Sequence, residues 1–396
     1  MTVFSELPLS AALQQKLAAA QFTTLTPVQE HAIPPALDGK DVIGTAQTGT
    51  GKTLAFLIPI IEMLQREPSQ QAKALVLLPT RELAMQVHAQ YEKLRGRGIP
   101  KAALVIGGVS EKLQIHSIRR NAGLIIATPG RLQDFIDRKL ADLRHIKMLV
   151  LDEADRMLDM GFLPAIRRIV SILPRDRQTL CYSATMEQSV AHIVHDYMSE
   201  PVRMALGSVL KPAESVQLKA YEVRPGEKLD VLRQLLFEET GQTLIFTRTK
   251  RGAERLAKEL MREGFSAAVI HGNCSQSQRN KALSGFQEGR FRVLVATDIA
   301  SRGLHVDDVA HVINYDVPKI AEDFIHRVGR TGRAGAQGHA STLAAGAEVV
   351  ELRHIERTLK LRIQREQIGL STAPKRVVQN TLTTRTLTAL PGEVFV

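Results

Sequence analysis

Short runs of apolar and β-branched residues alternate with stretches of helical period along the whole chain. This alternation is typical of βαβ construction, in which helices connect parallel strands. Most of the runs end in Gly, Thr, Asp or Pro, so polar residues collect where the strands end. The pattern therefore predicts an α/β fold whose ligands bind at the carboxyl ends of parallel strands.

The predicted strands fall into two sets. The first set lies at 41–46, 74–79, 103–108, 124–129, 148–155 and 179–185, and the second at 243–249, 267–272, 293–298, 311–318 and 339–345. Between the sets, 205–217 mixes Gly, Ser and Pro without a period, which is typical of a linker. A chain of 396 residues also suits two domains at roughly 100 to 200 residues each. Two such domains can place their strand ends across one cleft.

We therefore expect four parts in the chain. They are a first domain over 1–207, a linker over 208–215, a second domain over 216–370 and a tail over 371–396. The tail is rich in Thr, has no clear period and carries more basic than acidic residues. We interpret it as a loosely attached end, with contact to nucleic acid as the alternative.

The charge balance indicates an anionic partner. Lys and Arg number 52 against 41 Asp and Glu, a formal net charge of +11. Such an excess favours polyanions, nucleic acid first, although a merely basic soluble protein is the alternative. Aromatic residues are 4% and Trp is absent, so we expect contact with the nucleic-acid backbone rather than base stacking. Backbone contact predicts little sequence preference.

Other signals exclude several classes of protein. Cys181 and Cys274 are the only cysteines, too few for a disulfide framework or a Cys-rich zinc site. The longest apolar stretch, 54–61, is too short to cross a bilayer, and no signal sequence begins the chain. We expect a soluble, cytoplasmic protein. His192 and His195 lack further ligands, and the basic residues of 353–362 are interpreted as a solvated helix face.

A phosphate-binding turn follows the first predicted strand. Residues 46–53 read AQTGTGKT and lead into a helical pattern. Such a turn aims backbone N–H groups at phosphates, with Lys52 reaching the outer phosphates and the Thr53 hydroxyl available to Mg²⁺. Ala46 stands where the GxxxxGK[ST] pattern has its first Gly. The candidate nucleotide-binding residues of the turn are Ala46, Gln47, Thr48, Gly49, Thr50, Gly51, Lys52 and Thr53.

An acidic strand end supplies the partner of this turn. LVLDEAD at 149–155 is an apolar run ending in carboxylates, about a hundred residues later. Asp152 is suited to hold Mg²⁺ with Thr53, mainly through water, and Glu153 to orient an attacking water. Together with the turn it predicts an ATPase site.

Taken in order, these residues resemble the DEAD-box family of ATP-dependent RNA helicases in superfamily 2, from about Phe4 to Ala334. The string 152–155 reads DEAD itself. The resemblance implies two tandem RecA-like domains, each a mostly parallel sheet flanked by helices, joined by a short linker. It also implies RNA-stimulated ATP hydrolysis, coupled to local unwinding of short duplexes or remodelling of RNA–protein complexes. The short flanks are similar to the bacterial RhlE-like type, whose members act in ribosome assembly or RNA decay.

Further residues take roles from this resemblance alone. Segment 4–29 is similar to the family's adenine-reading segment, in which Phe22 stacks on the base and Gln29, beside Thr26, bonds its edge; a core position is the alternative for Phe22. The implied RNA-binding residues are Arg81, Gly108, Thr128, Pro129, Gly130, Arg131, Gln276, Arg279, Thr297 and Asp298. The implied coupling residues are Asp155, Ser183, Thr185, His326 and Arg327.

The motif HRVGRTGR at 326–333 implies a second half of the catalytic site. In the family, Arg330 and Arg333 reach the γ-phosphate across the cleft as arginine fingers, which contribute roughly 10³ to 10⁵ in rate. The resemblance therefore implies hydrolysis that depends on closure around RNA.

Two positions depart from the family pattern. His305 follows SRGL, which contains Gly303, at the place where an Asp usually contacts the ribose. Because imidazole can also form hydrogen bonds, we expect altered nucleotide affinity rather than lost activity. Asn273 stands where Asp is common, and the sequence does not indicate its effect.

Two other functions remain open from the sequence. An ATP-gated clamp without unwinding would be favoured by a damaged acid or arginine finger, yet Asp152, Glu153, Arg330 and Arg333 are all present. A DNA-directed motor of the same superfamily usually carries an additional domain, for which this chain has no spare segment.

Overall fold

The computed structural model describes residues 2–45, 50–67, 71–120, 122–183, 188–205, 215–298, 309–332 and 337–366. The predictions for Ala46, Gln47, Thr48, Gly49, Thr185, Gly303, His305 and Arg333 lie outside these residues, as do most of the linker and the whole tail 371–396.

The first lobe is built on a seven-stranded sheet in the order β3-β4-β2-β5-β6-β1-β7, and every pairing in it is parallel. Its strands are β1 (Val42–Thr45), β2 (Ala74–Leu77), β3 (Ala102–Val105), β4 (Leu124–Ala127), β5 (Met148–Asp152), β6 (Gln178–Ser183) and β7 (Val202–Ala205). Its helices are η1 (Phe4–Glu6), α1 (Ala11–Ala19), α2 (Pro27–Leu37), α3 (Lys52–Arg66), α4 (Arg81–Leu94), α5 (Glu111–Arg119), α6 (Pro129–Asp137), α7 (Ala154–Asp159), α8 (Leu163–Val170) and α9 (Gln188–Tyr197).

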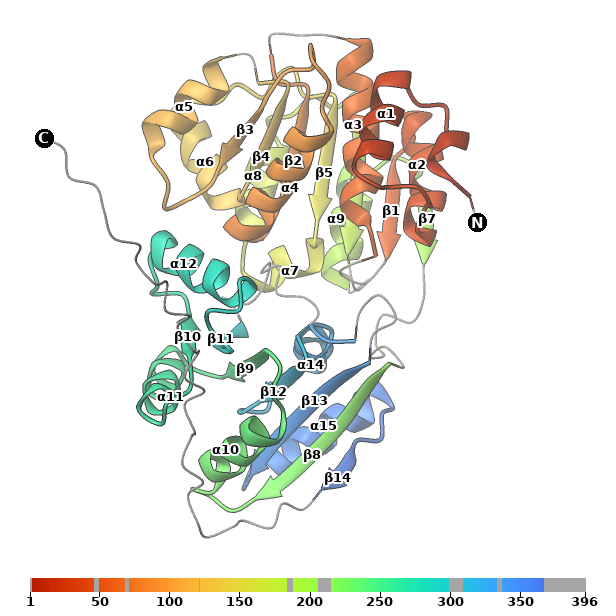
Figure 1. Cartoon of the computed structure of the whole chain (residues 1–396). Coiled ribbons are helices and arrows are strands. Elements are labelled where there is room, and N and C mark those ends of the chain that lie inside the picture. The colour runs from red at the N-terminus through yellow and green to blue at the C-terminus, as the bar shows by residue number, and fades with distance from the viewer. Residues whose placement is uncertain are drawn as a thin grey trace, which may run out of the picture.

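The second lobe repeats this plan with the order β10-β11-β9-β12-β13-β8-β14, again with parallel pairings throughout. Its strands are β8 (Val216–Val223), β9 (Thr243–Thr247), β10 (Ala267–Ile270), β11 (Val293–Thr297), β12 (His311–Asn314), β13 (Gly338–Ala345) and β14 (Gln364–Glu366). Its helices are α10 (Lys228–Glu238), α11 (Lys250–Arg262), α12 (Gln276–Gln287), α14 (Ala321–Val328) and α15 (Glu348–Leu359). The two tandem α/β lobes confirm the predicted fold class (Figure 1).

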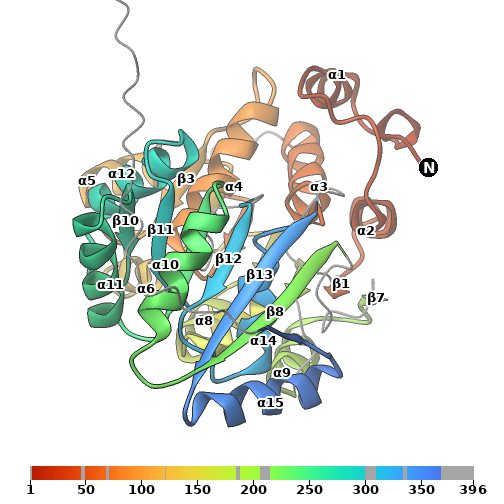
Figure 2. The same ribbon diagram turned by 60° about the horizontal axis from the view of Figure 1, so that its bottom comes forward.

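Alternation along each strand explains why helices cover both faces of each sheet. In β5, Val150 packs into one core together with helices α1 to α4, whereas Leu149 and Leu151 pack into the other core. Successive strand side chains point to opposite faces, so a strand buried on both sides must be apolar throughout. The second lobe is divided in the same way, with Leu244 of β9 on one face and Ile245 on the other. Figure 2 shows helices lying over both faces of this sheet.

Every strand predicted from the sequence is present, but three more complete the sheets, two at edges and one, β8, between β13 and β14. These are β7, β8 and β14. The strands β7 and β14 have only four and three residues, too few for a period to be recognised. In contrast, β8 has eight residues and buries Val216, Ala220 and Tyr221 among exposed polar neighbours. Its mixed pattern is typical of a strand that is half exposed.

None of the helices in the described parts of the chain is long and apolar enough to cross a membrane.

Candidate nucleotide and RNA sites

The carboxyl ends of three neighbouring strands carry the predicted ATPase residues. The strands β5, β6 and β1 lie side by side in the sheet. Asp152 is the last residue of β5 and Ser183 the last of β6, while the turn after β1 leads into α3 at Lys52. Parallel strands bring these ends to one edge, where Lys52, Asp152 and Glu153 influence one another's charge.

A capping box connects the predicted adenine-reading segment to the phosphate turn. Thr26 caps α2, accepting from Gln29 N, while Gln29 Oε1 accepts from Thr26 N at 2.9 Å. The other end of the Gln29 amide donates to the Gly51 carbonyl at 3.1 Å. Gly51 has φ of +90°, a conformation that favours glycine. The two segments are thus held together by direct bonds.

Phe22 is partly buried and packs against the core beside α1 and α2. Stacking on the adenine base and a position in the core are both compatible with this location, because part of the ring is still exposed.

Asp152 is a buried carboxylate with an unusual proton affinity. It is 3% exposed and accepts from Glu153 N at 3.0 Å. Burial raises the pKa of Asp152 to about 6, and the charge of Glu153 adds to the rise while Lys52 opposes it. A carboxylate in this setting gains from a further positive charge nearby.

Glu153 lies one residue later in a left-handed backbone conformation, with φ of +52°. Such a conformation is costly for a residue with a side chain, and it redirects the chain between β5 and α7. The carboxylate forms a buried ion pair with Arg156. Burial raises the pKa of Glu153, but Arg156, then Lys52 and more weakly Arg330 outweigh it and lower the pKa to about 2. Glu153 is therefore ionised at neutral pH.

Two of the three predicted coupling residues of the first lobe are in contact, and the third, Thr185, lies outside the described residues. Asp155 N donates to Ser183 Oγ at 3.3 Å, and both side chains are buried. This bond joins the start of α7 to the end of β6, so a shift of one segment is transmitted to the other.

Arg330 and His326 of the second lobe lie close to the acids of the first. The Arg330 charge reaches Glu153, and Arg330 is 7% exposed. Burial, then the charge of Arg156, lower the pKa of His326 to about 4, so the imidazole is neutral at pH 7. Because these groups of the two lobes interact, the two lobes are closed on each other in this structure.

Arg327, predicted as a coupling residue, forms an ion pair with Asp298, which was predicted to bind RNA. The guanidinium donates to both Asp298 oxygens at 2.5 and 2.7 Å. It also donates to Asn314 Oδ1 and the Asp316 carbonyl, and lies 5.1 Å from the Phe246 ring centre. With its oxygens held by Arg327, Asp298 has a fixed orientation at the end of β11. Thr297 precedes it and is buried.

The first-lobe residues predicted to bind RNA lie at the starts of helices α4 and α6 and in the glycine turn after β3. A Cβ on Gly107 would lie 2.7 Å from Arg81 Nη2, and one on Gly108 would overlap Nη1, so the guanidinium lies directly on this glycine pair. Thr128 N donates to the Val105 carbonyl at 3.1 Å. This bond brings the segment 128–131, which reads TPGR, beside the glycine pair.

Within that segment, Pro129 begins α6 and Gly130 follows it. Arg131 pairs with Asp134 at 3.0 Å and lies 5.0 Å from the Phe135 ring centre, both within α6. It also pairs with Glu111 of α5 at 3.4 Å, so the guanidinium connects α6 to α5.

A functional residue that sequence reasoning missed is Glu82. It is 5% exposed and accepts from Arg279 Nε at 2.6 Å and from Gln276 Nε2 at 3.3 Å. These partners belong to α12 of the second lobe, so Glu82 connects the lobes. Glu82 lies in the sequence PTRELA at 79–84. No local pattern there indicates that this acidic side chain, rather than another on the helix, faces the other lobe.

Comparison with known sequences agrees with this geometry. The profile of the DEAD/DEAH box helicase family matches residues 26–193, and that of the helicase conserved C-terminal domain matches 227–335. The chain belongs to the DEAD-box helicase family. The DEAD-box ATP-dependent RNA helicase CshA of Geobacillus kaustophilus is 42% identical over 366 residues, covering 92% of this chain and 78% of that one.

Two solved structures of DEAD-box proteins bear on the arrangement of the lobes. S. cerevisiae Dbp5 bound to RNA and ADP BeF3 is 30% identical and has a TM-score of 0.84, over 93% of this chain and 96% of that one. A DEAD box protein from Methanococcus jannaschii is 37% identical, yet its TM-score is 0.54 over 92% and 99%. Although its sequence is less similar, the Dbp5 structure superposes better on the two lobes taken together.

Proposed function

We propose that this DEAD-box helicase uses ATP hydrolysis to separate short RNA duplexes locally or to remodel RNA–protein complexes. The observation that carries the proposal is the proximity of Arg330, from the second lobe, to Glu153 of the first. Catalytic groups divided between two lobes act together only when the lobes close. A ligand that bridges the lobes therefore controls hydrolysis.

The nucleotide is ATP, held by the turn that ends at Lys52 and by the segment containing Gln29. We assign the nucleotide-binding role to Phe22, Thr26, Gln29, Gly303, His305 and the turn residues 46–53. Support comes from the bond between Gln29 and Gly51, which connects base-reading and phosphate-binding segments. Arg330 and Arg333 serve as the arginine fingers.

Mg²⁺ is the metal that fits the acidic strand end. Asp152 is buried, its pKa is raised, and neighbouring carboxylates add to the rise. Oxygen ligands suit this ion, which binds through one or two carboxylates, water and substrate phosphates. Asp152 and Thr53 would hold the ion, which when bound neutralises charge on the phosphates.

Separate residues of the chain have separate roles in catalysis. Glu153 is ionised and anchored by Arg156, which suits it to accept a hydrogen bond from the attacking water. Lys52 and Arg330 stabilise negative charge that develops on the transferred phosphoryl group. Asp155, Ser183, Thr185, His326 and Arg327 transmit the state of the nucleotide to the RNA side of the cleft.

RNA is bound by its backbone along the segments that contain Arg81 and Gly108 and along 128–131, and from the second lobe by Gln276, Arg279, Thr297 and Asp298. The clustering of these first-lobe segments at one place supports this assignment. Backbone contact predicts activity on many RNAs, of the kind required in ribosome assembly or RNA decay in the cytoplasm. Co-sedimentation with ribosomal particles, compared with co-purification of ribonucleases, distinguishes these two settings.

The division into domains is part of the proposal. We assign 1–207 and 216–370 to the two domains, 208–215 to the linker and 371–396 to a tail. The end of β7 at Ala205 and the start of β8 at Val216 support these bounds.

The experiment that tests the function is steady-state ATP hydrolysis with and without single-stranded RNA, with matched DNA as control and Glu153→Gln as the blank. We expect stimulation by RNA alone, and a loss of roughly 10² to 10⁴ in rate for the variant. Equal stimulation by DNA would favour a DNA motor, and absence of hydrolysis under every condition would favour a nucleotide-gated clamp.

A further inference from the structure

A shallow hollow of about 760 Å³ lies on the second lobe, between the end of α15 and the edge strand β14. Four arginines and two glutamates line it together with Leu361 and Ile363. None of its lining residues is one assigned above to ATP or to RNA. Its four cations and two anions leave a local excess of positive charge.

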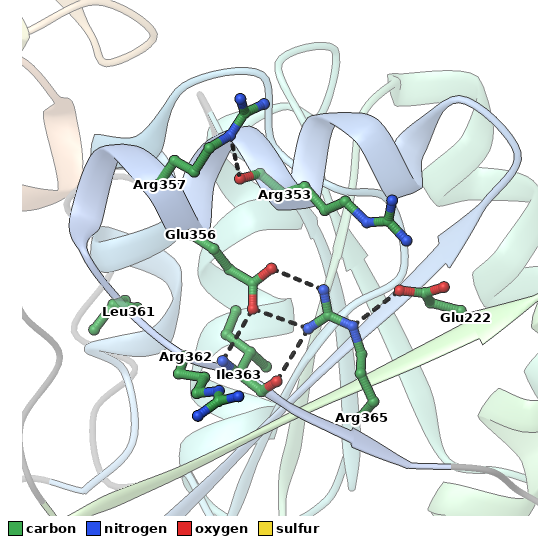
Figure 3. A pocket seen from close by; sticks show the side chains of 8 residues that line it. All are labelled: Glu222, Arg353, Glu356, Arg357, Leu361, Arg362, Ile363 and Arg365. Atoms are coloured by element: carbon green, nitrogen blue, oxygen red, sulfur yellow. Dashed lines mark hydrogen bonds and ion pairs between the residues drawn. The ribbon is translucent and has the colours of Figure 1, made fainter.

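Both carboxylates of the hollow are bonded to one arginine. Arg365 donates to Glu356 through two nitrogens, at 2.7 and 3.0 Å, and to Glu222 through Nε at 2.9 Å. Glu356 also accepts from Ile363 N at 3.0 Å. Figure 3 shows Arg365 lying between the two glutamates. The bridge offsets one of the two negative charges, and the other arginines leave the lining as a whole with an excess of positive charge.

The other three arginines lack a short ion pair in the described part of the lobe. Burial raises the pKa of Glu356, but the bonds from Arg365 and, after them, the charge of Arg353 help to lower it. Arg353, Arg357 and Arg362 are exposed, and within the described residues none of them forms an ion pair with a carboxylate. Arg357 Nε donates only to the Arg353 carbonyl, at 3.3 Å. Like charges four residues apart on a helix, as in Arg353 and Arg357, destabilise it. A guanidinium without an acidic partner presents a planar set of donors suited to phosphate.

The adjoining sequence cannot supply the missing anions. Residues 367–396 follow β14 directly and carry Lys375, Arg376 and Arg385 against the single acid Glu393. The residues that follow β14 therefore add positive rather than negative charge to the sequence.

We propose that Arg353, Arg357 and Arg362 bind the phosphodiester backbone of an RNA segment that extends beyond the cleft. The proposal rests on the proposed function, because it takes RNA as the ligand. It replaces our interpretation of this basic helix as merely solvated. The site would hold the helicase on a structured RNA while the cleft acts on a short stretch of it.

The geometry determines which RNAs can reach both sites. Gln276 and Arg279 begin α12, which packs against β10 and β11 at one edge of the sheet, whereas β14 is the opposite edge. Six strand spacings of about 4.8 Å separate these edges, roughly 29 Å. A stacked strand covers that distance in roughly nine nucleotides at about 3.4 Å each. A short oligonucleotide that fills the cleft therefore cannot reach the hollow.

The test compares a single-stranded RNA of about 6 nucleotides, too short to span this distance, with one of about 40. The variant carries Arg353→Gln, Arg357→Gln and Arg362→Gln. The matched control carries Arg224→Gln, Arg262→Gln and Arg290→Gln, which remove the same charge from exposed sites on the same lobe.

We expect the variant to bind the long RNA at least about tenfold more weakly than the control, with a salt slope lower by about 2, from some 0.7 per phosphate contact. The short RNA should bind and stimulate hydrolysis equally in both proteins. Equal affinity of variant and control for the long RNA would overturn the proposal and leave an acidic protein as the partner of the hollow. If neither RNA stimulates ATP hydrolysis by the unsubstituted chain, the proposed function is overturned instead.

Discussion

Glu82 Oε1 of the first lobe lies 2.6 Å from Arg279 Nε of the second, and both side chains are almost fully buried. The pair exists only while the lobes are closed, so its energy stabilises the closed state and not the fold of either lobe.

Glu82→Gln tests this relationship, because it removes the charge but keeps the shape. A hydrogen bond to a charged group contributes about 1.5–3 kcal/mol, so the RNA concentration for half-maximal ATPase should rise roughly 10- to 100-fold. The thermal midpoint of the free protein should stay within about 2 °C of the unsubstituted value, since ΔΔG for each lobe is small. A lower midpoint with unchanged RNA dependence would contradict the assignment.

Gly51→Ala tests the connection between the adenine-reading segment and the phosphate turn. A Cβ there would overlap the Gln29 amide and approach Thr26 Oγ1 to 3.0 Å, and φ is +90°. Strain of about 1–2 kcal/mol should raise the KM for ATP roughly tenfold. Gly226→Ala is the matched control, because its φ is +98° but nothing lies within 4 Å of the added Cβ. An equal KM in both variants would show that the contact with Gln29 is unimportant.

Arg330→Lys tests the arginine finger. Lysine keeps one positive charge but lacks the planar set of donors. We expect single-turnover hydrolysis with saturating RNA to fall by about 10³, whereas the affinity for ATP changes little. A rate within about tenfold of the unsubstituted protein would exclude Arg330 from the transition state.

His311 gives the second lobe a pH dependence that is separate from catalysis. Burial lowers the pKa of His311 to about 4, from 6.5. The neutral ring lies 2.8 Å from Ser341 Oγ. Because the folded pKa is below the unfolded one, the folded state binds fewer protons, and stability is present above pH 6.5 and lost as pH falls toward 4. The free energy of unfolding should fall by roughly 3 kcal/mol over this range.

Urea denaturation at several pH values measures this slope, and His311→Gln should make it shallower. An NMR titration of the His311 ring in the folded protein gives the pKa directly. A midpoint near 6.5 would contradict the effect of burial.

The sequence alone determined the fold class and the strand ends that carry chemistry. The apolar composition of runs such as 148–155 predicts buried strands. The parallel α/β plan follows from the alternation of these strands with helices. The positions of Lys52, Asp152 and Glu153 were evident for the same reason, because phosphate turns and acidic strand ends are local patterns. Short edge strands were missed, since three or four residues show no period.

Only the tertiary structure decided which side chains meet. Glu82 and Arg279 are 197 residues apart, Arg327 is matched to Asp298, and Arg365 uses both acids of its hollow while three neighbouring arginines keep their charge. Each of these pairings depends on where the chain brings distant segments together, and on burial, which makes an unpartnered charge costly. Local sequence specifies the elements, whereas contacts between elements and between lobes depend on packing that no short stretch of sequence contains.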